Sequence, residues 1–330
     1  MRLLKLPKLF FQLLRYRVAV MLLMFLLLGI AVHDGLTGFS VYYLYAAISV
    51  ICGYVAATSI NDIADEKIDK VNHPGSEGRP LVSGEASVAD LYTLNGLSAA
   101  ASVLFAFIIG NTALVIALIS VTISYAYSLR PAAISHRTHG AYFLLAVAYV
   151  LLPYWLGVAA TGAVFGISDL YLTASLMALF FGRILLKDFR DRKGDTAYGK
   201  PTFLLKYGKR ATVTLSAISI LAGNALLLLS LRENGIIKLL LLEILFVLIY
   251  ASGYMLLKAR SFKSEQVAIG LGAKLGNGVV LSLLGLFILK GYNAPEGHAL
   301  FFQAAITMLF AASFAYLAQR PKIAIIGYRG

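Results

Sequence analysis

Residues 61–69 read NDIADEKID, and residues 188–195 read DFRDRKGD. Each stretch carries three aspartates at positions i, i+3 and i+7. These are Asp62, Asp65 and Asp69 in the first motif, and Asp188, Asp191 and Asp195 in the second. On a helix of about 100° per residue, such a triplet falls within about 60° on one face. Each triplet follows a long apolar run, so we expect two carboxylate clusters at the ends of two membrane helices.

The surrounding sequence is that of a helical membrane protein. Of its 330 residues, 59% are hydrophobic, and the mean hydropathy is +0.80. The apolar runs are continuous and about 20 residues long, which suits helices that cross a bilayer core of about 30 Å and excludes a β-barrel. The sequence therefore predicts an all-α, polytopic bundle of about nine to ten transmembrane helices. The runs are 18–32, 40–60, 90–110, 112–128, 141–161, 169–187, 212–231, 236–257, 269–290 and 299–319.

Basic residues set the predicted orientation. The formal net charge is +13, which could suggest a nucleic-acid partner. Most of the lysines and arginines, however, fall in alternate connections between the runs, and the opposite connections hold only Arg232, Lys238 and Lys290. By the positive-inside rule, both termini and both motif loops are cytoplasmic, and no nucleic acid is needed to explain the charge. We expect an integral multi-pass protein of the cell (inner) membrane.

The chain reads as a single transmembrane domain over 1–330 with no soluble appendage. Its longest polar connections are the motif loops 61–88 and 188–211, and four runs separate the two motifs. Beyond the acidic motifs and the glycine-containing basic stretches after them, the two halves share no convincing identity. An internal repeat is therefore only weakly indicated.

Carboxylates at helix ends, without clustered His or Cys, suit a hard cation such as Mg²⁺. This ion binds through a few carboxylates together with substrate phosphates. The two motifs therefore predict a Mg²⁺–diphosphate site, with Asp65 and Asp191 as its catalytic residues. Nearby basic residues could complete the diphosphate cradle: Arg79, Lys187, Arg190, Arg192 and Lys200. Arg183 and Lys274 are pointed candidates because they fall inside predicted spans, where an unpaired charge is costly.

The motifs resemble those of the UbiA superfamily of intramembrane prenyltransferases. The pattern Asn61-Asp62-x-x-Asp65-x-x-x-Asp69 looks like the first signature of that family. The stretches His73-Pro74 and Arg79-Pro80-Leu81-x-Ser83-Gly84 resemble its continuation. Residues 187–202 resemble the second signature, and Tyr127-Ser128 resembles a further motif with imperfect spacing. The resemblance covers the first seven predicted spans.

The resemblance implies a helical bundle around a central cavity that is open to lipid and capped by the two cytoplasmic loops. It implies Mg²⁺-dependent transfer of a prenyl group from an isoprenyl diphosphate donor to a small lipophilic acceptor, which we expect to be aromatic on family frequency. By position, Asn61 and the first triplet would serve one metal–diphosphate site, and the second triplet would serve the other. The family typically has nine spans and the sequence has ten runs, so either two of the C-terminal runs form a single broken element or an extra helix is present.

Other functions remain open at this point. A terpene cyclase on the same scaffold would ionise the same diphosphate and quench the cation within the molecule. A polyprenyl-phosphate phosphoribosyl transferase is a further variant. A non-enzymatic transporter or channel is disfavoured because the acids lie at the rim and not at the midplane. A CDP-alcohol phosphotransferase would need an Asp-Gly-x-x-Ala-Arg opening, which the sequence lacks.

Overall fold

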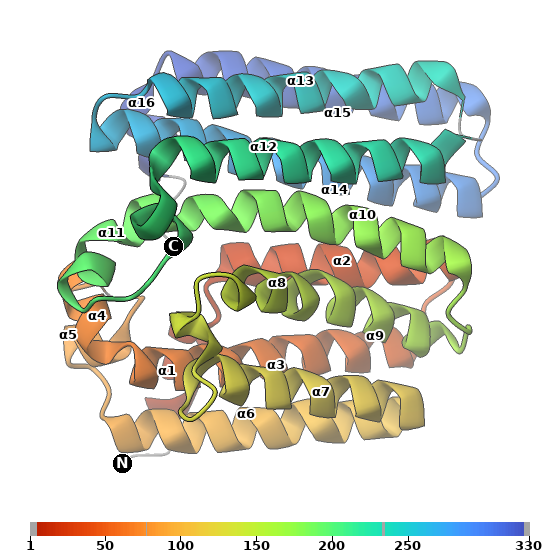
Figure 1. Cartoon of the computed structure of the whole chain (residues 1–330). Coiled ribbons are helices and arrows are strands. Elements are labelled where there is room, and N and C mark those ends of the chain that lie inside the picture. Colours follow the sequence, from red (N-terminus) through yellow and green to blue (C-terminus); the bar gives the residue numbers. More distant parts are fainter. Residues whose placement is uncertain (1–4, 77, 233–234, 327–330) are drawn as a thin grey trace. The chain divides into compact units, whose positions relative to one another are not determined.

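The computed structural model describes residues 5–76, 78–232 and 235–326. The outermost residues of both predicted cytoplasmic termini, 1–4 and 327–330, and Glu77 of the first motif loop lie outside the described residues. The described residues form helices and contain no strand (Figure 1). The helical fold class is therefore confirmed.

Ten helices in the described part of the chain are long and apolar enough to cross a bilayer, as predicted. The chain is an integral multi-pass membrane protein. Single helices form eight of these spans: α2 (Tyr16–Asp34), α3 (Val41–Ala64), α6 (Val88–Ile109), α7 (Asn111–Ser128), α12 (Phe203–Leu231), α13 (Ile236–Lys258), α14 (Phe262–Gly291) and α15 (Glu296–Ala318). Because α14 and α15 are separate helices, the last two predicted runs are not one broken element.

Two predicted spans are more irregular than the sequence suggested. The run 141–161 divides into α8 (Gly140–Ala146), a π-helical turn (Val147–Leu151) and α9 (Leu152–Thr161). Pro153 has no backbone N–H, so it cannot donate to the carbonyl one turn earlier, and the wider turn absorbs the lost bond. The run 169–187 becomes α10 (Ile167–Ile184), a 3₁₀ turn (Leu185–Lys187) and α11 (Asp188–Ala197).

Short helices occupy the polar connections. They are α1 (Leu6–Leu13), α4 (Glu66–Asn72), α5 (Pro80–Ser83), a 3₁₀ turn (Ile134–His136) and α16 (Pro321–Ile326). Proline stands in the first turn of α1 and of α5, where its missing N–H costs nothing.

The chain divides into two compact units. Among the described residues, the first unit holds 5–29, 39–76, 78–164 and 190–206. The second holds 30–38, 165–189, 207–232 and 235–326. In the first unit, α3 packs against α6, α7 and α9, and also contacts α1 and α4. In the second unit, α13, α14 and α15 pack on one another, and α10 contacts α14 (Figure 1). The single domain over 1–330 and its central cavity stay predictions.

Close contact through small residues marks the second unit. A Cβ added to Gly182 of α10 would stand 2.7 Å from the Ser216 carbonyl oxygen of α12, and Gly223 of α12 meets α10 in the same way. The Ser216 hydroxyl in turn donates to the Gly182 carbonyl at 2.6 Å. Small residues let the two backbones approach closely, and the hydroxyl bond adds to the association.

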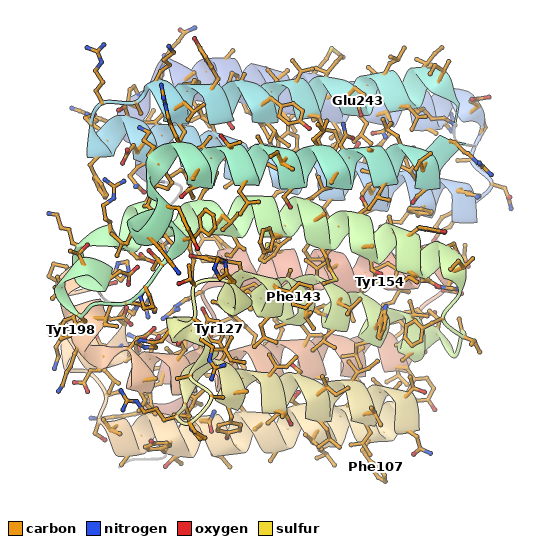
Figure 2. The ribbon with its side chains drawn as sticks, viewed as in Figure 1. Phe107, Tyr127, Phe143, Tyr154, Tyr198 and Glu243 are labelled. Carbon is orange, nitrogen blue, oxygen red and sulfur yellow. The ribbon has the colours of Figure 1, made fainter. Side chains whose placement is uncertain are left out.

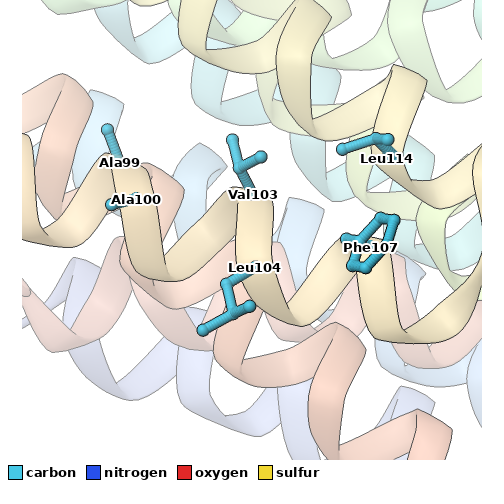
Figure 3. Close-up of a pocket in the computed structure, with 6 residues that line it drawn as sticks. All are labelled: Ala99, Ala100, Val103, Leu104, Phe107 and Leu114. Carbon is cyan, nitrogen blue, oxygen red and sulfur yellow. The ribbon is translucent and has the colours of Figure 1, made fainter.

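In the first unit, Tyr154 is fully buried on α9 (Figure 2). An apolar groove of about 520 Å³ lies on α6 and α7 (Figure 3). It is lined by Ala99, Ala100, Val103, Leu104, Phe107 and Leu114. Because no charged side chain lines it, the groove cannot be the diphosphate site.

Candidate functional site: the two aspartate motifs

The first aspartate motif lies where α3 passes into α4. Asp62 is in the last turn of α3, Asp65 is the C-cap residue of that helix, and Asp69 is in α4. The i→i−4 bonds continue across the junction, since the Asp65 amide donates to Asn61 and the Asp69 amide donates to Asp65, both at 2.8 Å. The triplet therefore spans two helices that are nearly continuous, and not the one helix that the sequence predicted. All three side chains are buried.

The second motif lies on α11, as the spacing predicted. Asp188 begins the helix, and Asp188 and Asp195 are both buried. The Nε of Arg190 donates to Oδ1 of Asp191 at 2.9 Å. The chain leaves α11 through Gly199, whose φ of +63° suits glycine, and then reaches Pro201. This turn brings Lys200 back towards the first motif.

Three contacts within the first unit bring the two motifs together. The Gly194 amide of α11 donates to Oδ1 of Asn72, at the end of α4, at 2.6 Å. His73 Nε2 lies 3.6 Å from Asp191 Oδ1. Lys200 Nζ donates to Asp65 Oδ2 at 3.2 Å. The structure thus brings Asp65 and Asp191, with Lys200 and His73, into one region of the first unit. From the sequence, only the matching spacing of the two motifs suggested this.

Gly194 permits this approach. A Cβ built on it would stand 2.6 Å from Asn72 Nδ2 and 2.7 Å from the backbone oxygen of Ile68, closer than real Cβ contacts. One of these atoms belongs to the backbone of α4 and cannot rotate away. Glycine at this position therefore allows α11 to touch α4.

Two arginines neutralise Asp62. Arg15, between α1 and α2, donates from Nη2 to Asp62 Oδ1 at 2.7 Å and to Oδ2 at 2.8 Å. Arg79 donates from Nη1 to Asp62 Oδ1 at 2.7 Å and also bonds Asp69 Oδ2. Burial lowers the pKa of Arg15, but the attraction of Asp62 outweighs it, so the pKa of Arg15 lies above its usual value. Charge-assisted bonds of this kind are the strong ones.

Asp65 has different hydrogen-bond partners from Asp62. Its Oδ2 accepts from Asn61 Nδ2 and from Lys200 Nζ, both at 3.2 Å. Its Oδ1 is buried without a hydrogen-bond partner, and His136 Nε2 stands 3.8 Å away. Burial raises the pKa of Asp65, but His136 and Lys200 outweigh it and hold the pKa at about 2. The carboxylate is therefore ionised and has an oxygen available for a cation.

Asp69 is shifted in the opposite direction. Burial raises the pKa of this carboxyl to about 7, which the neighbouring Arg79 opposes and the Asp62 charge assists. Within the described residues, no three Asp, Glu, His or Cys side chains are already gathered as a metal site. The fit to Mg²⁺ rests instead on the open Asp65 oxygen and on the all-oxygen character of the motif donors.

Arg192 lies on α11 within the first unit, whereas Arg183, Lys187 and Lys274 belong to the second unit. On α10, Arg183 donates from Nη1 to Asn277 Oδ1 of α14 at 2.9 Å. Lys187 ends the 3₁₀ turn after α10, and Lys274 lies on α14. The roles assigned to these residues and to all the other predicted site residues stay predictions.

The sequence indicated no site role for Arg15, Asn72 or His136, and it marked His73 only as part of the family-like stretch after the first motif. Arg15 read as a topology signal, and nothing in its spacing separates a ligand arginine from an orienting one. His73 follows the first motif by four residues, and its place after the α4 helix end was a usable signal. His136 and Asn72 gave no signal in the sequence, because their partners in the site are distant along the chain.

The UbiA prenyltransferase family matches residues 22–277. The chain belongs to this family. The bacteriochlorophyll synthase 34 kDa chain of Chloroflexus aurantiacus is 28% identical over 189 residues, which are 56% of this chain and 59% of that protein. Digeranylgeranylglyceryl phosphate synthase of Methanococcus aeolicus is 29% identical over 175 residues, 52% of this chain and 57% of that protein. The chain thus spans less than two thirds of the length of these relatives.

Solved structures share the fold. A structure described for digeranylgeranylglyceryl phosphate synthase in membranes matches with a TM-score of 0.66 and 20% identity, covering 87% of this chain and 99% of that chain. A UbiA homologue from Archaeoglobus fulgidus bound to GPP and Mg²⁺ matches with a TM-score of 0.57 and 17% identity, covering 94% and 99%. At these identities the likeness concerns the fold.

Proposed function

We propose that the protein transfers a prenyl group from an isoprenyl diphosphate to a lipophilic acceptor within the membrane, with Mg²⁺. Membership of the UbiA prenyltransferase family supports this activity. The observation that carries the proposal is the meeting of the two aspartate motifs through Gly194–Asn72, His73–Asp191 and Lys200–Asp65. A relative of the same fold is bound to GPP and Mg²⁺.

The aspartates of the two motifs, with Asn61, form the proposed pool of metal ligands, and Asp65 and Asp191 are its central members. Bound Mg²⁺ would neutralise the charge that develops on the departing diphosphate. Lys200 and Arg79 would hold the diphosphate, since both cations already lie among the motif carboxylates and can exchange those partners for phosphate oxygens. The diphosphate-binding roles predicted from the sequence for Arg183, Lys187 and Lys274, which belong to the second unit, stay separate predictions.

The remaining step requires a dry environment. The apolar spans would hold the isoprenyl tail and keep water from the allylic cation until the acceptor attacks. The relatives are named for chlorophyll, bacteriochlorophyll and digeranylgeranylglyceryl phosphate products. We therefore propose a lipophilic acceptor, with the aromatic class as the first to test. The cell membrane, with the motif loops on its cytoplasmic side, is the proposed location.

The test is diphosphate release by purified protein in detergent, with geranyl, farnesyl and geranylgeranyl diphosphates and a panel of acceptors. Release that needs both Mg²⁺ and an acceptor supports the proposal and identifies the acceptor class. Release without an acceptor, together with a cyclic product, would assign the protein as a cyclase. No release by folded protein under any condition would reject both.

A further inference from the structure

The N-terminal segment lies outside the part of the chain that matches the family, which begins at residue 22. It is nevertheless firmly anchored. Leu9 and Leu13 of α1 are buried against Val55 of α3 and against Leu81 and Leu91 near the first motif loop. Lys8 pairs with Glu85 of the same loop at 3.1 Å, and Gln12 also bonds Glu85. The segment therefore has a fixed position beside the loop that carries Arg79.

The backbone between α1 and α2 is shaped to present Arg15. Its φ of +41° lies in the left-handed region, which L-residues with long side chains rarely adopt. The bend directs the guanidinium to both oxygens of Asp62, at 2.7 and 2.8 Å. The Arg15 side chain is 18% exposed and that of Asp62 is 2% exposed. A conformation this unusual persists only where the surrounding contacts hold it.

Arg15 leaves Asp62 little capacity for a metal ion. Three hydrogen bonds from two guanidinium nitrogens, Arg15 Nη2 and Arg79 Nη1, already occupy its two oxygens. A divalent cation at the same carboxylate would face both positive charges at close range. Asp65 differs, because one of its oxygens is buried without a hydrogen-bond partner.

The contact between Arg15 and Asp62 also determines which carboxylate oxygens the Arg79 side chain can reach. With Arg15 spanning Asp62, Arg79 reaches only one Asp62 oxygen and extends its Nη1 to Asp69. Without Arg15, Asp62 would be a buried carboxylate that could accept both arms of Arg79 in the bidentate geometry that this pair favours. Arg79 would then turn away from Asp69 and from the region where the two motifs meet.

We propose that Arg15 is a positioning residue, delivered by the N-terminal helix α1, which converts Asp62 from a metal ligand into an anchor that holds Arg79 ready for the diphosphate. This inference rests on the proposed function and refines the role of Asp62 within it. Arg15 acts through Arg79 and does not touch the substrate.

The decisive experiment is a double-mutant cycle on Arg15 and Arg79. Arg15→Ala should raise the KM for geranylgeranyl diphosphate about tenfold or more and leave the Mg²⁺ concentration for half-maximal release unchanged. In an Arg79→Ala background, the Arg15→Ala change should have little further effect on KM, since residues that act as a unit are not additive. Arg15→Lys should recover only part of the loss, because one ammonium nitrogen can replace the single nitrogen that contacts both Asp62 oxygens, but the lysine side chain is shorter and its ammonium is more strongly hydrated.

Arg17→Ala is the matched control. Arg17 contacts the exposed ring of Tyr16, and its removal should leave KM at the wild-type value. Equal KM changes from Arg15→Ala in both backgrounds would overturn the proposal, because Arg15 would then act independently of Arg79. A shift of the Mg²⁺ requirement in Arg15→Ala with no change in KM would overturn it as well.

A second measurement does not depend on turnover. Arg79 lies at the start of α5, where its carbonyl accepts from the Val82 and Ser83 amides. Hydrogen exchange at residues 79–83 should become faster in Arg15→Ala and stay unchanged in Arg17→Ala. If exchange is faster in Arg15→Ala than in wild-type protein but wild-type protein releases no diphosphate, the proposed function fails and the role of Arg15 in holding Arg79 stands. If exchange is unchanged in Arg15→Ala, the anchor itself is wrong.

Discussion

Replacing Gly194 with alanine should separate the two aspartate motifs. The new methyl group would stand 2.6 Å from Asn72 Nδ2 and 2.7 Å from the Ile68 carbonyl oxygen. Ordinary contact needs about 3.4 Å or more, so α11 must withdraw from α4 by several tenths of an ångström. Inserting one extra carbon into a packed contact costs about 1–3 kcal/mol.

Two further terms enter the balance. Withdrawal stretches the Gly194–Asn72 hydrogen bond of 2.6 Å, worth about 1 kcal/mol. Alanine is better than glycine in a helix by about 1 kcal/mol, which offsets this loss. The net cost to the docked arrangement is then about 1–3 kcal/mol, which corresponds to a population of docked motifs about 5- to 150-fold lower.

The assay is Mg²⁺ titration of diphosphate release, because a separated site should need more Mg²⁺ for half-maximal activity. Gly96→Ala is the control, since Gly96 lies in α6 and a Cβ there meets nothing within 4 Å. That variant should keep the wild-type Mg²⁺ requirement, with stability unchanged or raised by up to about 1 kcal/mol. A Gly194→Ala protein with the wild-type Mg²⁺ requirement would refute the packing argument.

Three other outcomes are expected. In metal-free protein, the pKa of Asp69 is raised to about 7 in the folded state. Between about pH 4 and pH 7 the folded state therefore holds a proton that the unfolded state has released. The free energy of unfolding should fall across this range by at most about 4 kcal/mol and stay constant above it. Thermal unfolding across this range checks it, and the fall should be absent in Asp69→Asn. Leu13→Ala should cost about 2–5 kcal/mol in denaturant unfolding because Leu13 is fully buried, whereas Phe11→Ala, at a site 71% exposed, should change stability by less than about 0.5 kcal/mol. Lys200→Met should raise the donor KM at saturating Mg²⁺, and an unchanged KM would remove Lys200 from the diphosphate site.

Much of the fold could be predicted because the bilayer imposes a simple rule. A run of about 20 apolar residues has to become a helix, since no other conformation of a single segment hydrogen-bonds all its backbone N–H and C=O groups in lipid. The rule fails only where the helix itself is irregular, as in the run 141–161. There Pro153 opens a π-helical turn, and hydropathy alone could not reveal it.

The candidate site was predictable only in part. The spacing of Asp65, Asp191 and their neighbours identified the motif residues, because one helical face requires that spacing. The partners that position them come from elsewhere in the chain. Arg15 is 47 residues from Asp62, and the Gly194–Asn72 contact spans 122 residues. No local pattern encodes such pairs, since they depend on how the helices pack.

The most direct test of the central claim compares wild-type protein with Asp65→Ala and Asp191→Ala, one central residue from each motif. All three are purified in detergent, shown to be folded by thermal unfolding, and titrated with Mg²⁺ at saturating geranylgeranyl diphosphate and the best acceptor. Mg²⁺-dependent diphosphate release that disappears in both variants, with their folding intact, is the expected result. Wild-type levels of Mg²⁺-dependent release in both folded variants would contradict the claim that the two motifs form one site.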